Sequence, residues 1–141
     1  WGEVGPANIS EAFAREHMTR GRRWAIVNAW RHTGDAPTLA STPLALLDDA
    51  TVRWGSDEVM YYPITMGGKV AFNYTLQHSP THRWLYYPNM SKDELLLFKA
   101  FGSSASEGKR PFVLFHSAFD LPGAAHAEPR ASLEVRSVVA W

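Results

Sequence analysis

The sequence contains no cysteine, so disulfide bonds, thiolate zinc sites and cysteine nucleophiles are excluded together. It has no excess charge of either sign, because 14 basic side chains balance 14 acidic ones. No run of Lys or Arg is longer than the pair Arg22-Arg23, which argues against nucleic acid or an anionic membrane surface as a partner. No stretch approaches the roughly 18–20 apolar residues that span a bilayer. We therefore expect a soluble, cytoplasmic protein, and the sequence leaves open whether it forms a homo-oligomer.

Hydrophobic residues make up 45% of the 141 residues, which is enough to build the core of one domain. One amphipathic helix is expected at Ala7–Met18, with Asn8 or Ser10 as its N-cap. Ser91 and Glu94 have the spacing of a capping box, which predicts one helical turn. Aromatic and apolar stretches predict strands at Arg23–Trp30, Leu44–Leu47, Lys69–Gln77, Arg83–Tyr87, Leu95–Phe101, Phe112–Phe119 and Ser132–Trp141. The predicted fold class is mainly β, a sandwich or jelly roll with a short N-terminal helix.

Two features toward the C-terminal end of the sequence are candidates for chemistry. His116 lies in the apolar stretch Phe112–Phe119, where a histidine taken alone is more often a hydrogen-bonded structural residue. Arg130 follows fourteen residues later, and Ser132 shares its face of an extended strand. A guanidinium fork beside a hydroxyl is a good receptor for a carboxylate, and the alternative partner for Arg130 is Glu134 on the same face.

A histidine followed at this distance by Arg-x-Ser resembles the distal part of the site in 2-oxoglutarate oxygenases. The resemblance extends over nearly all of the chain to the AsaB-like hydroxylase/desaturase family, together with gibberellin desaturase and the cephalosporin 7α-methoxylase P8-chain proteins. The matching stretches are, in order, Ile26–Arg31, Pro43–Leu46, His82–Tyr87, Met90–Lys99, His116–Phe119 and Pro129–Arg136.

This resemblance implies a double-stranded β-helix, that is, a cupin-like jelly roll. It also implies Fe(II)- and 2-oxoglutarate-dependent use of O₂ to hydroxylate or desaturate a small molecule of secondary metabolism. By position, His116 is the implied iron ligand and catalytic residue, and Arg130 and Ser132 are the implied anchors of 2-oxoglutarate. Tyr74, Tyr86 and Asn73 are further candidates to line the co-substrate pocket. Candidate substrate contacts are Trp30, Arg31 and Asn73.

The sequence departs from the family pattern at two points. The His-x-Asp pair that supplies the other two iron ligands in the family is absent from residues 1–141. We therefore expect the chain to be the C-terminal part of a single oxygenase domain with that strand upstream, and we reject the loop residues His126-Ala-Glu128 as a substitute. His32 stands where the family usually has Pro, and we interpret it as a solvent-facing loop residue, with a substrate contact as the alternative.

Two other functions are the alternatives to the oxygenase. A non-catalytic jelly-roll module that has lost iron would bind a small acid or a partner chain and would hold no metal at His116. An accessory role in methyl transfer would need a nucleotide site, and the sequence has no glycine-rich phosphate or dinucleotide loop. The adjacent acidic pairs Asp48-Asp49 and Asp93-Glu94 suit turns and caps better than acid/base chemistry.

Overall fold

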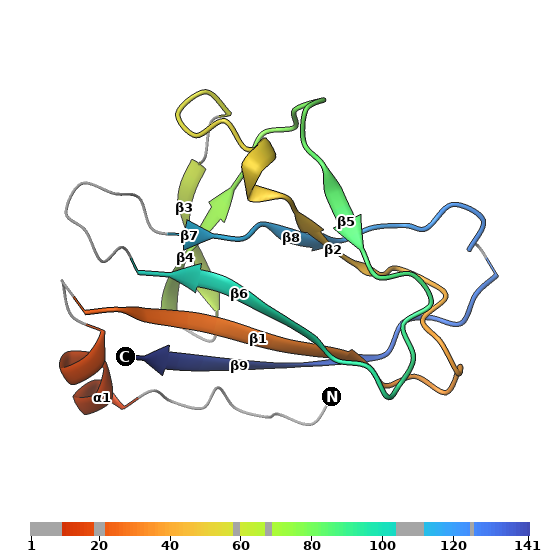
Figure 1. The fold of residues 1–141 in the computed structure, drawn as a ribbon, viewed down its shortest axis with the longest axis horizontal. Helices are drawn as coiled ribbons and strands as arrows, with labels where there is room; N and C mark the ends of the chain where they lie inside the picture. Colours follow the sequence, from red (N-terminus) through yellow and green to blue (C-terminus); the bar gives the residue numbers. More distant parts are fainter. Residues whose placement is uncertain (1–9, 19–21, 58–59, 67–68, 104–111, 125) are drawn as a thin grey trace. The chain divides into compact units, whose positions relative to one another are not determined.

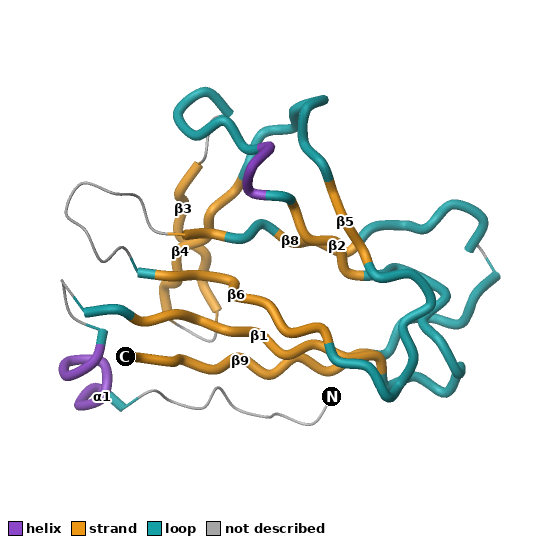
Figure 2. The backbone as a smooth tube through the Cα atoms, in the orientation of Figure 1, coloured by secondary structure: helices purple, strands orange, loops and turns teal. Residues whose placement is uncertain are grey.

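The structure is a computed structural model that describes residues 10–18, 22–57, 60–66, 69–103, 112–124 and 126–141. The chain divides into two compact units, each of which is described by itself. The first unit comprises Trp1–Ala29, Leu97–Val113 and Val135–Trp141, and the second comprises Trp30–Leu96 and Leu114–Glu134. Strands predominate among the described residues, and helix is confined to α1 and one short 3-10 turn (Figures 1 and 2).

The first unit contains the helix α1 (Glu11–His17). Its N-cap is Ser10, whose side chain accepts a hydrogen bond from the backbone N–H of Phe13 at 3.1 Å. This satisfies one of the N–H groups that a helix leaves without a partner at its N-terminus. The helix and the cap at Ser10 are confirmed, whereas the predicted start at Ala7 and the alternative cap Asn8 lie outside the described residues.

The strands of the first unit belong to a four-stranded sheet in the order β7-β6-β1-β9. These strands are β7 (Phe112–Val113), β6 (Leu96–Gly102), β1 (Trp24–His32) and β9 (Ser132–Ala140). The C-terminal end of β1 and the N-terminal end of β9 belong to the second unit. Within the first unit, Trp24 stacks on Phe101 with ring centroids 5.1 Å apart, and Ala25 and Phe98 are buried. No residue of β1 is exposed before Arg31, and the strand predicted at Arg23–Trp30 is confirmed.

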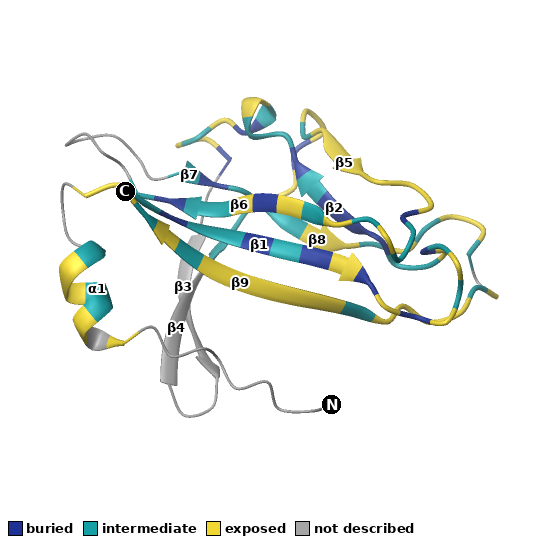
Figure 3. Ribbon diagram, turned by 60° about the horizontal axis from the view of Figure 1, so that its bottom comes forward, coloured by how far each residue is buried: buried dark blue, intermediate teal, exposed yellow. Residues whose placement is uncertain are grey.

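The second unit contains a three-stranded antiparallel sheet in the order β5-β2-β8. Its strands are β2 (Leu44–Leu47), β5 (Trp84–Tyr86) and β8 (His116–Ala118). The central strand β2 is largely buried, and Leu47 is only 1% exposed, whereas all three residues of β5 are exposed (Figure 3). The residue pairs in this sheet fix which side chains share a face, and they therefore position the candidate site.

A second sheet of the second unit is the antiparallel hairpin of β3 (Met60–Met66) and β4 (Lys69–Thr75). Strand β4 is predicted from the sequence, but β3 is not, because Pro63 interrupts its pattern. Proline lacks the N–H that a central strand must donate, and it is tolerated in a two-stranded sheet because each strand has an open edge. The 3-10 turn η1 (Asp49–Thr51) is capped by the Asp48 carboxylate, as expected for this acidic pair.

Two predicted elements differ from the structure. The predicted strand Phe112–Phe119 is two short strands, β7 and β8, because Leu114 and Phe115 leave the strand conformation between them. The predicted helical turn at Ser91–Glu94 is a non-helical turn, although Glu94 does accept the capping-box hydrogen bond from the Ser91 N–H at 2.7 Å. None of the helices in the described part of the chain has the length and apolar character needed to cross a membrane.

Candidate active site

His116 is the first residue of β8, at one edge of the three-stranded sheet, and its side chain is half-buried. Its Nδ1 atom lies 2.9 Å from the carbonyl oxygen of Leu114. A carbonyl oxygen only accepts, so Nδ1 carries a proton, and in the tautomer with that proton alone the lone pair is on Nε2. Histidines that bind metals are held in this way, with one ring N–H donated to a carbonyl and the other nitrogen directed at the ion.

The two faces of this sheet have different chemistry. Leu46 of β2 is paired with both His116 and Leu85, and residues directly opposite in an antiparallel pair have side chains on the same face. Ala45 is paired with Ser117 and Tyr86, so these side chains occupy the other face. Consecutive residues of one strand therefore present an imidazole to one face and a hydroxyl to the other.

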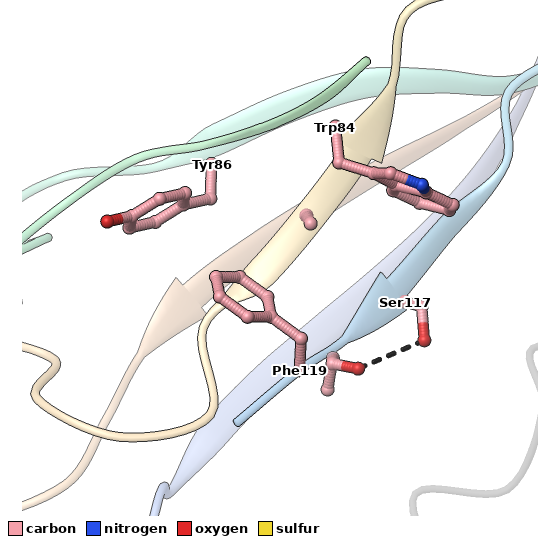
Figure 4. A pocket seen from close by; sticks show the side chains of 6 residues that line it. Trp84, Tyr86, Ser117 and Phe119 are labelled. Carbon is pink, nitrogen blue, oxygen red and sulfur yellow. Dashed lines mark hydrogen bonds between the residues drawn. The ribbon is translucent and has the colours of Figure 1, made fainter. Parts of the chain in front are cut away.

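Each face is hollowed. On the face of Ser117, a cavity of about 480 Å³ is lined by aromatic side chains and the small floor residue Ala45 (Figure 4). On the face of Leu46, a smaller cavity of about 160 Å³ is lined mainly by leucines. The register places Tyr86 beside Ala45 and Ser117, on the opposite face from His116, although Tyr86 also borders the smaller cavity. The expected place of Tyr86 in the co-substrate pocket stays a prediction.

Arg130 lies in the same unit as His116 and is exposed. Its Nη1 donates to the carbonyl oxygen of Thr42 at 3.1 Å, and its guanidinium carbon is 5.9 Å from the ring centroid of Trp30. Thr42 adopts a φ of 40°, a backbone conformation that is rare for a β-branched residue. Thr42 lies two residues before β2 and four residues before Leu46, which is the strand partner of His116. Four residues of extended chain span at most about 14 Å, so the Cα atoms of Thr42 and Leu46 are no farther apart than this.

Other predicted site residues are spread over several elements. Ser132 is the half-buried first residue of β9. Trp30 is 5% exposed, and its ring lies beside the Arg130 guanidinium. Arg31 is exposed, and its guanidinium donates to the backbone carbonyl of Lys92. The structure thus brings Trp30 and Arg130 together and turns Arg31 toward the loop after Met90.

Tyr74 and Asn73 belong to the β3–β4 hairpin, which is a different sheet from the one that carries His116. Tyr74 is half-buried and is paired with Tyr61. Asn73 is paired with Tyr62, and its side chain lies outside the described residues. Their proposed contact with the co-substrate stays a prediction.

His32 is not the solvent-facing loop residue that the sequence suggested. It ends β1 and is only 3% exposed, with Nδ1 3.1 Å from the carbonyl oxygen of Ala131 and Nε2 3.0 Å from that of Ala36. The strand runs two residues beyond its predicted end at Trp30, so His32 falls on the buried side of β1. Its contacts hold the segment that carries Arg130 beside the end of β1.

The donor set was compared with the needs of a non-haem iron site. The protonated Nδ1 of His116 makes Nε2 a suitable ligand for Fe(II). Among the described residues, however, no group of three or more His, Asp or Glu side chains is placed to hold a metal ion. The described chain therefore fits one nitrogen ligand of an iron site, and the exposed His126 lies in a loop away from any such group.

A buried polar cluster at the start of β5 was not predicted from the sequence. His82 Nε2 donates to Asp57 Oδ2 at 3.0 Å, and both side chains are less than 5% exposed. The Arg53 backbone N–H also donates to this carboxylate, and together with His82 it holds the pKa of Asp57 below its ordinary value. The Arg53 guanidinium reaches Ser79 as well. No local periodicity connects residues 25 positions apart, so the sequence gives no signal for this pair.

Two further hydrogen-bonded pairs flank β5. Arg83 forms an ion pair with Asp48. This ion pair and a hydrogen bond from the Ala50 N–H both lower the pKa of the Asp48 carboxyl. The Tyr87 hydroxyl donates to Glu94 at 2.7 Å, which raises the pKa of Tyr87 because ionisation would break the bond beside a carboxylate. The Ser91 N–H and the Tyr87 hydroxyl lower the pKa of Glu94. Polar contacts therefore fasten both ends of this exposed strand.

Comparison with known proteins places these features in a family. A family profile described as an oxidoreductase/YMDC permease-like domain matches residues 3–140. The chain is 31% identical to an alpha-ketoglutarate-dependent dioxygenase, phiK, of a fungal species, over 99% of this chain and 51% of that protein. It is 30% identical to the hydroxylase/desaturase asaB of Aspergillus flavus, over 91% of this chain and 60% of that protein. The chain thus spans about half of the length of these curated relatives.

The fold has a counterpart among solved structures. The iron and alpha-ketoglutarate-dependent endoperoxidase NvfI matches 85% of this chain and 43% of its own, with a TM-score of 0.62 and 24% identity. This likeness, with the antiparallel sheets, confirms the predicted mainly β, double-stranded β-helix fold. Together with the profile over residues 3–140, the matches show that the chain belongs to the oxidoreductase family of the AsaB-like hydroxylase/desaturases.

Proposed function

We propose that the protein containing this chain is a non-haem Fe(II)- and 2-oxoglutarate-dependent oxygenase that hydroxylates or desaturates a small molecule of secondary metabolism. Bound iron, with 2-oxoglutarate and O₂, would supply the oxidation of an unactivated C–H bond. The relatives phiK and asaB are named as a dioxygenase and a hydroxylase/desaturase, which supports this class of reaction. The same proposal makes O₂ and a small organic substrate the partners and the cytoplasm the location.

The contact between His116 and Leu114 carries the proposal. A hydrogen bond of 2.9 Å from Nδ1 to a backbone carbonyl fixes the ring and its tautomer before any metal arrives. A structural histidine on this strand could equally be hydrogen-bonded through either nitrogen. The bond through Nδ1 selects Nε2 as the metal-binding atom, and the other two ligands would come from a His-x-Asp pair outside these 141 residues.

Arg130 is the residue that we propose to hold the distal carboxylate of 2-oxoglutarate. Its bond to Thr42 uses one of the five guanidinium N–H donors, and the face of Trp30 restricts where the planar group can lie. An oriented fork binds a carboxylate through two parallel hydrogen bonds, and the Ser132 hydroxyl would add a third donor. The residue would bind and orient the co-substrate without taking part in proton transfer.

The test measures conversion of 2-oxoglutarate to succinate, and Fe(II) binding, in the intact protein. We expect His116→Ala to lower turnover by about a hundredfold or more and to weaken iron binding, because one of the proposed iron ligands is lost. Arg130→Lys should raise the KM for 2-oxoglutarate by about tenfold with little change in iron affinity, because lysine cannot bind a carboxylate bidentately.

The matched control is His126→Ala, which removes an exposed loop histidine and should leave both measurements unchanged. Undiminished turnover in His116→Ala would contradict the assignment of the iron ligand. Intact protein that neither binds Fe(II) nor consumes 2-oxoglutarate would favour the alternative, a binding module that has lost iron.

A further inference from the structure

The larger of the two cavities beside the β5-β2-β8 sheet lies on the opposite face of the sheet from His116. Ala45 forms its floor, and Ser117 and Tyr86 flank Ala45 in register on the two neighbouring strands. Trp84 and Phe119 are each two residues away from these partners and complete the walls (Figure 4). The β5-β2-β8 sheet itself therefore separates this cavity from the imidazole of His116, and a ligand in the cavity would not contact that imidazole.

The walls of the cavity are flat, aromatic and uncharged. The rings of Tyr86 and Phe119 meet edge to face, with centroids 5.1 Å apart and an interplanar angle of 73°. Trp84 and Tyr86 are 44% and 43% exposed, so much of their ring surface still contacts solvent. None of the described residues that line the cavity carries a charge. Such walls favour stacking with a planar or ring-containing molecule and offer no partner for a phosphate or a carboxylate.

One polar group gives the cavity a direction. The Ser117 hydroxyl donates to the Ala118 carbonyl oxygen at 3.0 Å, and the hydroxyl oxygen then retains its capacity to accept. A ligand with a single O–H or N–H group on an otherwise apolar ring would match this acceptor. The small side chain of Ala45 makes the cavity deep, because this residue is 5% exposed and its methyl group leaves room that a larger side chain would fill.

We propose that this cavity is a second binding site, distinct from the proposed iron site, for an uncharged, ring-containing small molecule that carries one hydrogen-bond donor. A volume of about 480 Å³ falls within the roughly 300–1,000 Å³ of small-molecule sites. The proposal does not depend on bound iron or on 2-oxoglutarate. It assigns the exposed aromatic side chains of β5 to ligand binding and not to the core.

The test titrates the intact protein with 2-naphthol by isothermal calorimetry in the presence of a chelator. We expect saturable binding of one molecule, and about tenfold weaker binding in Trp84→Ala, because a stacking partner and its buried area are lost. Ser117→Leu should abolish binding by filling the cavity from an exposed position, whereas Ser117→Ala should weaken it by only about threefold through loss of one hydrogen bond. The anion 2-naphthalenesulfonate should bind at least about tenfold more weakly than 2-naphthol.

Leu85→Ala is the matched control, since Leu85 lies between Trp84 and Tyr86 on the same strand and points to the other face. It should bind 2-naphthol as the unchanged protein does. The proposal is overturned if 2-naphthol produces no saturable heat, if Leu85→Ala weakens binding as much as Trp84→Ala, or if the sulfonate binds equally well. Protection of Trp84 from acrylamide quenching in the intact protein would also overturn it, because another segment would then cover the cavity.

Discussion

Strands β2 and β5 are neighbours in one sheet, yet different forces hold them in place. Three of the four residues of β2 are buried, and Leu47 is 1% exposed, so β2 is held by apolar packing. All three residues of β5 are exposed, and its ends are fastened by the polar pairs at His82, Arg83 and Tyr87. The comparison indicates that the centre of the sheet supplies stability, which leaves the outer strand's side chains available for binding.

Substitution at the centre of the sheet should have the largest effect on stability. Leu47→Ala removes a fully buried side chain from β2, and we expect it to lower the free energy of unfolding by about 2–5 kcal/mol. Leu85→Ala makes the same chemical change on β5, where the side chain is 52% exposed, and should change stability by less than about 0.5 kcal/mol. Urea denaturation followed by circular dichroism gives both values. Equal losses in the two variants would remove the distinction between the strands.

Acid should weaken the attachment of β5 more than the packing of β2. The folded pKa of Asp57 lies below its ordinary value of 3.8, so the unfolded chain takes up a proton first as the pH falls. This contribution to stability is complete above pH 3.8 and is lost as the pH falls from there through the lowered folded pKa. Asp57→Asn should therefore flatten the dependence of unfolding free energy on pH in this window, which denaturation at a series of pH values measures.

The exposed pair at the same end of β5 provides the comparison for Asp57. Asp48 also has a lowered pKa, but its side chain is 21% exposed, against 4% for Asp57. Solvent screens an exposed ion pair, so Asp48→Asn should flatten the same curve by less. A larger effect from Asp48→Asn than from Asp57→Asn would show that the buried cluster is not the main polar attachment of β5.

The sequence predicted the elements in which one pattern dominates. Strands β1, β2, β4 and β9 have long apolar or alternating stretches, and their predicted bounds agree with the structure to within about two residues. The double-stranded β-helix class followed from these strands and from the family motifs, and it is confirmed. Strand β3 was missed because Pro63 hides its alternation, and the break after Val113 was missed because Leu114 and Phe115 are as apolar as a strand.

The candidate site was predictable in its residue types but not in its arrangement. His116 and Arg130 were identified from their types and spacing, and their roles in iron and 2-oxoglutarate binding stay predictions. The carbonyl of Thr42 that orients Arg130 has no signal in the sequence, because a positive φ at a β-branched residue is set by its surroundings. The sequence gives no signal for the face of the sheet on which Tyr86 lies, because this depends on the register between β2 and β5, which only the structure supplies.

The smallest expected effect is at the other end of β5, where Tyr87 donates to Glu94. Ionisation of Tyr87 would remove the donor and place a phenolate beside a carboxylate, so the pKa of Tyr87 is raised above its ordinary value of 10.0. Alkaline titration of tyrosinate absorbance, taken as the difference between the unchanged protein and Tyr87→Phe, isolates this residue from the other four tyrosines. Glu94→Gln keeps an acceptor but removes the charge, and it should lower the midpoint of that difference curve. A midpoint that does not move would mean that the hydrogen bond alone, without the carboxylate charge, raises the pKa of Tyr87. The polar attachment of β5 at this end would then not depend on the ionisation of Glu94.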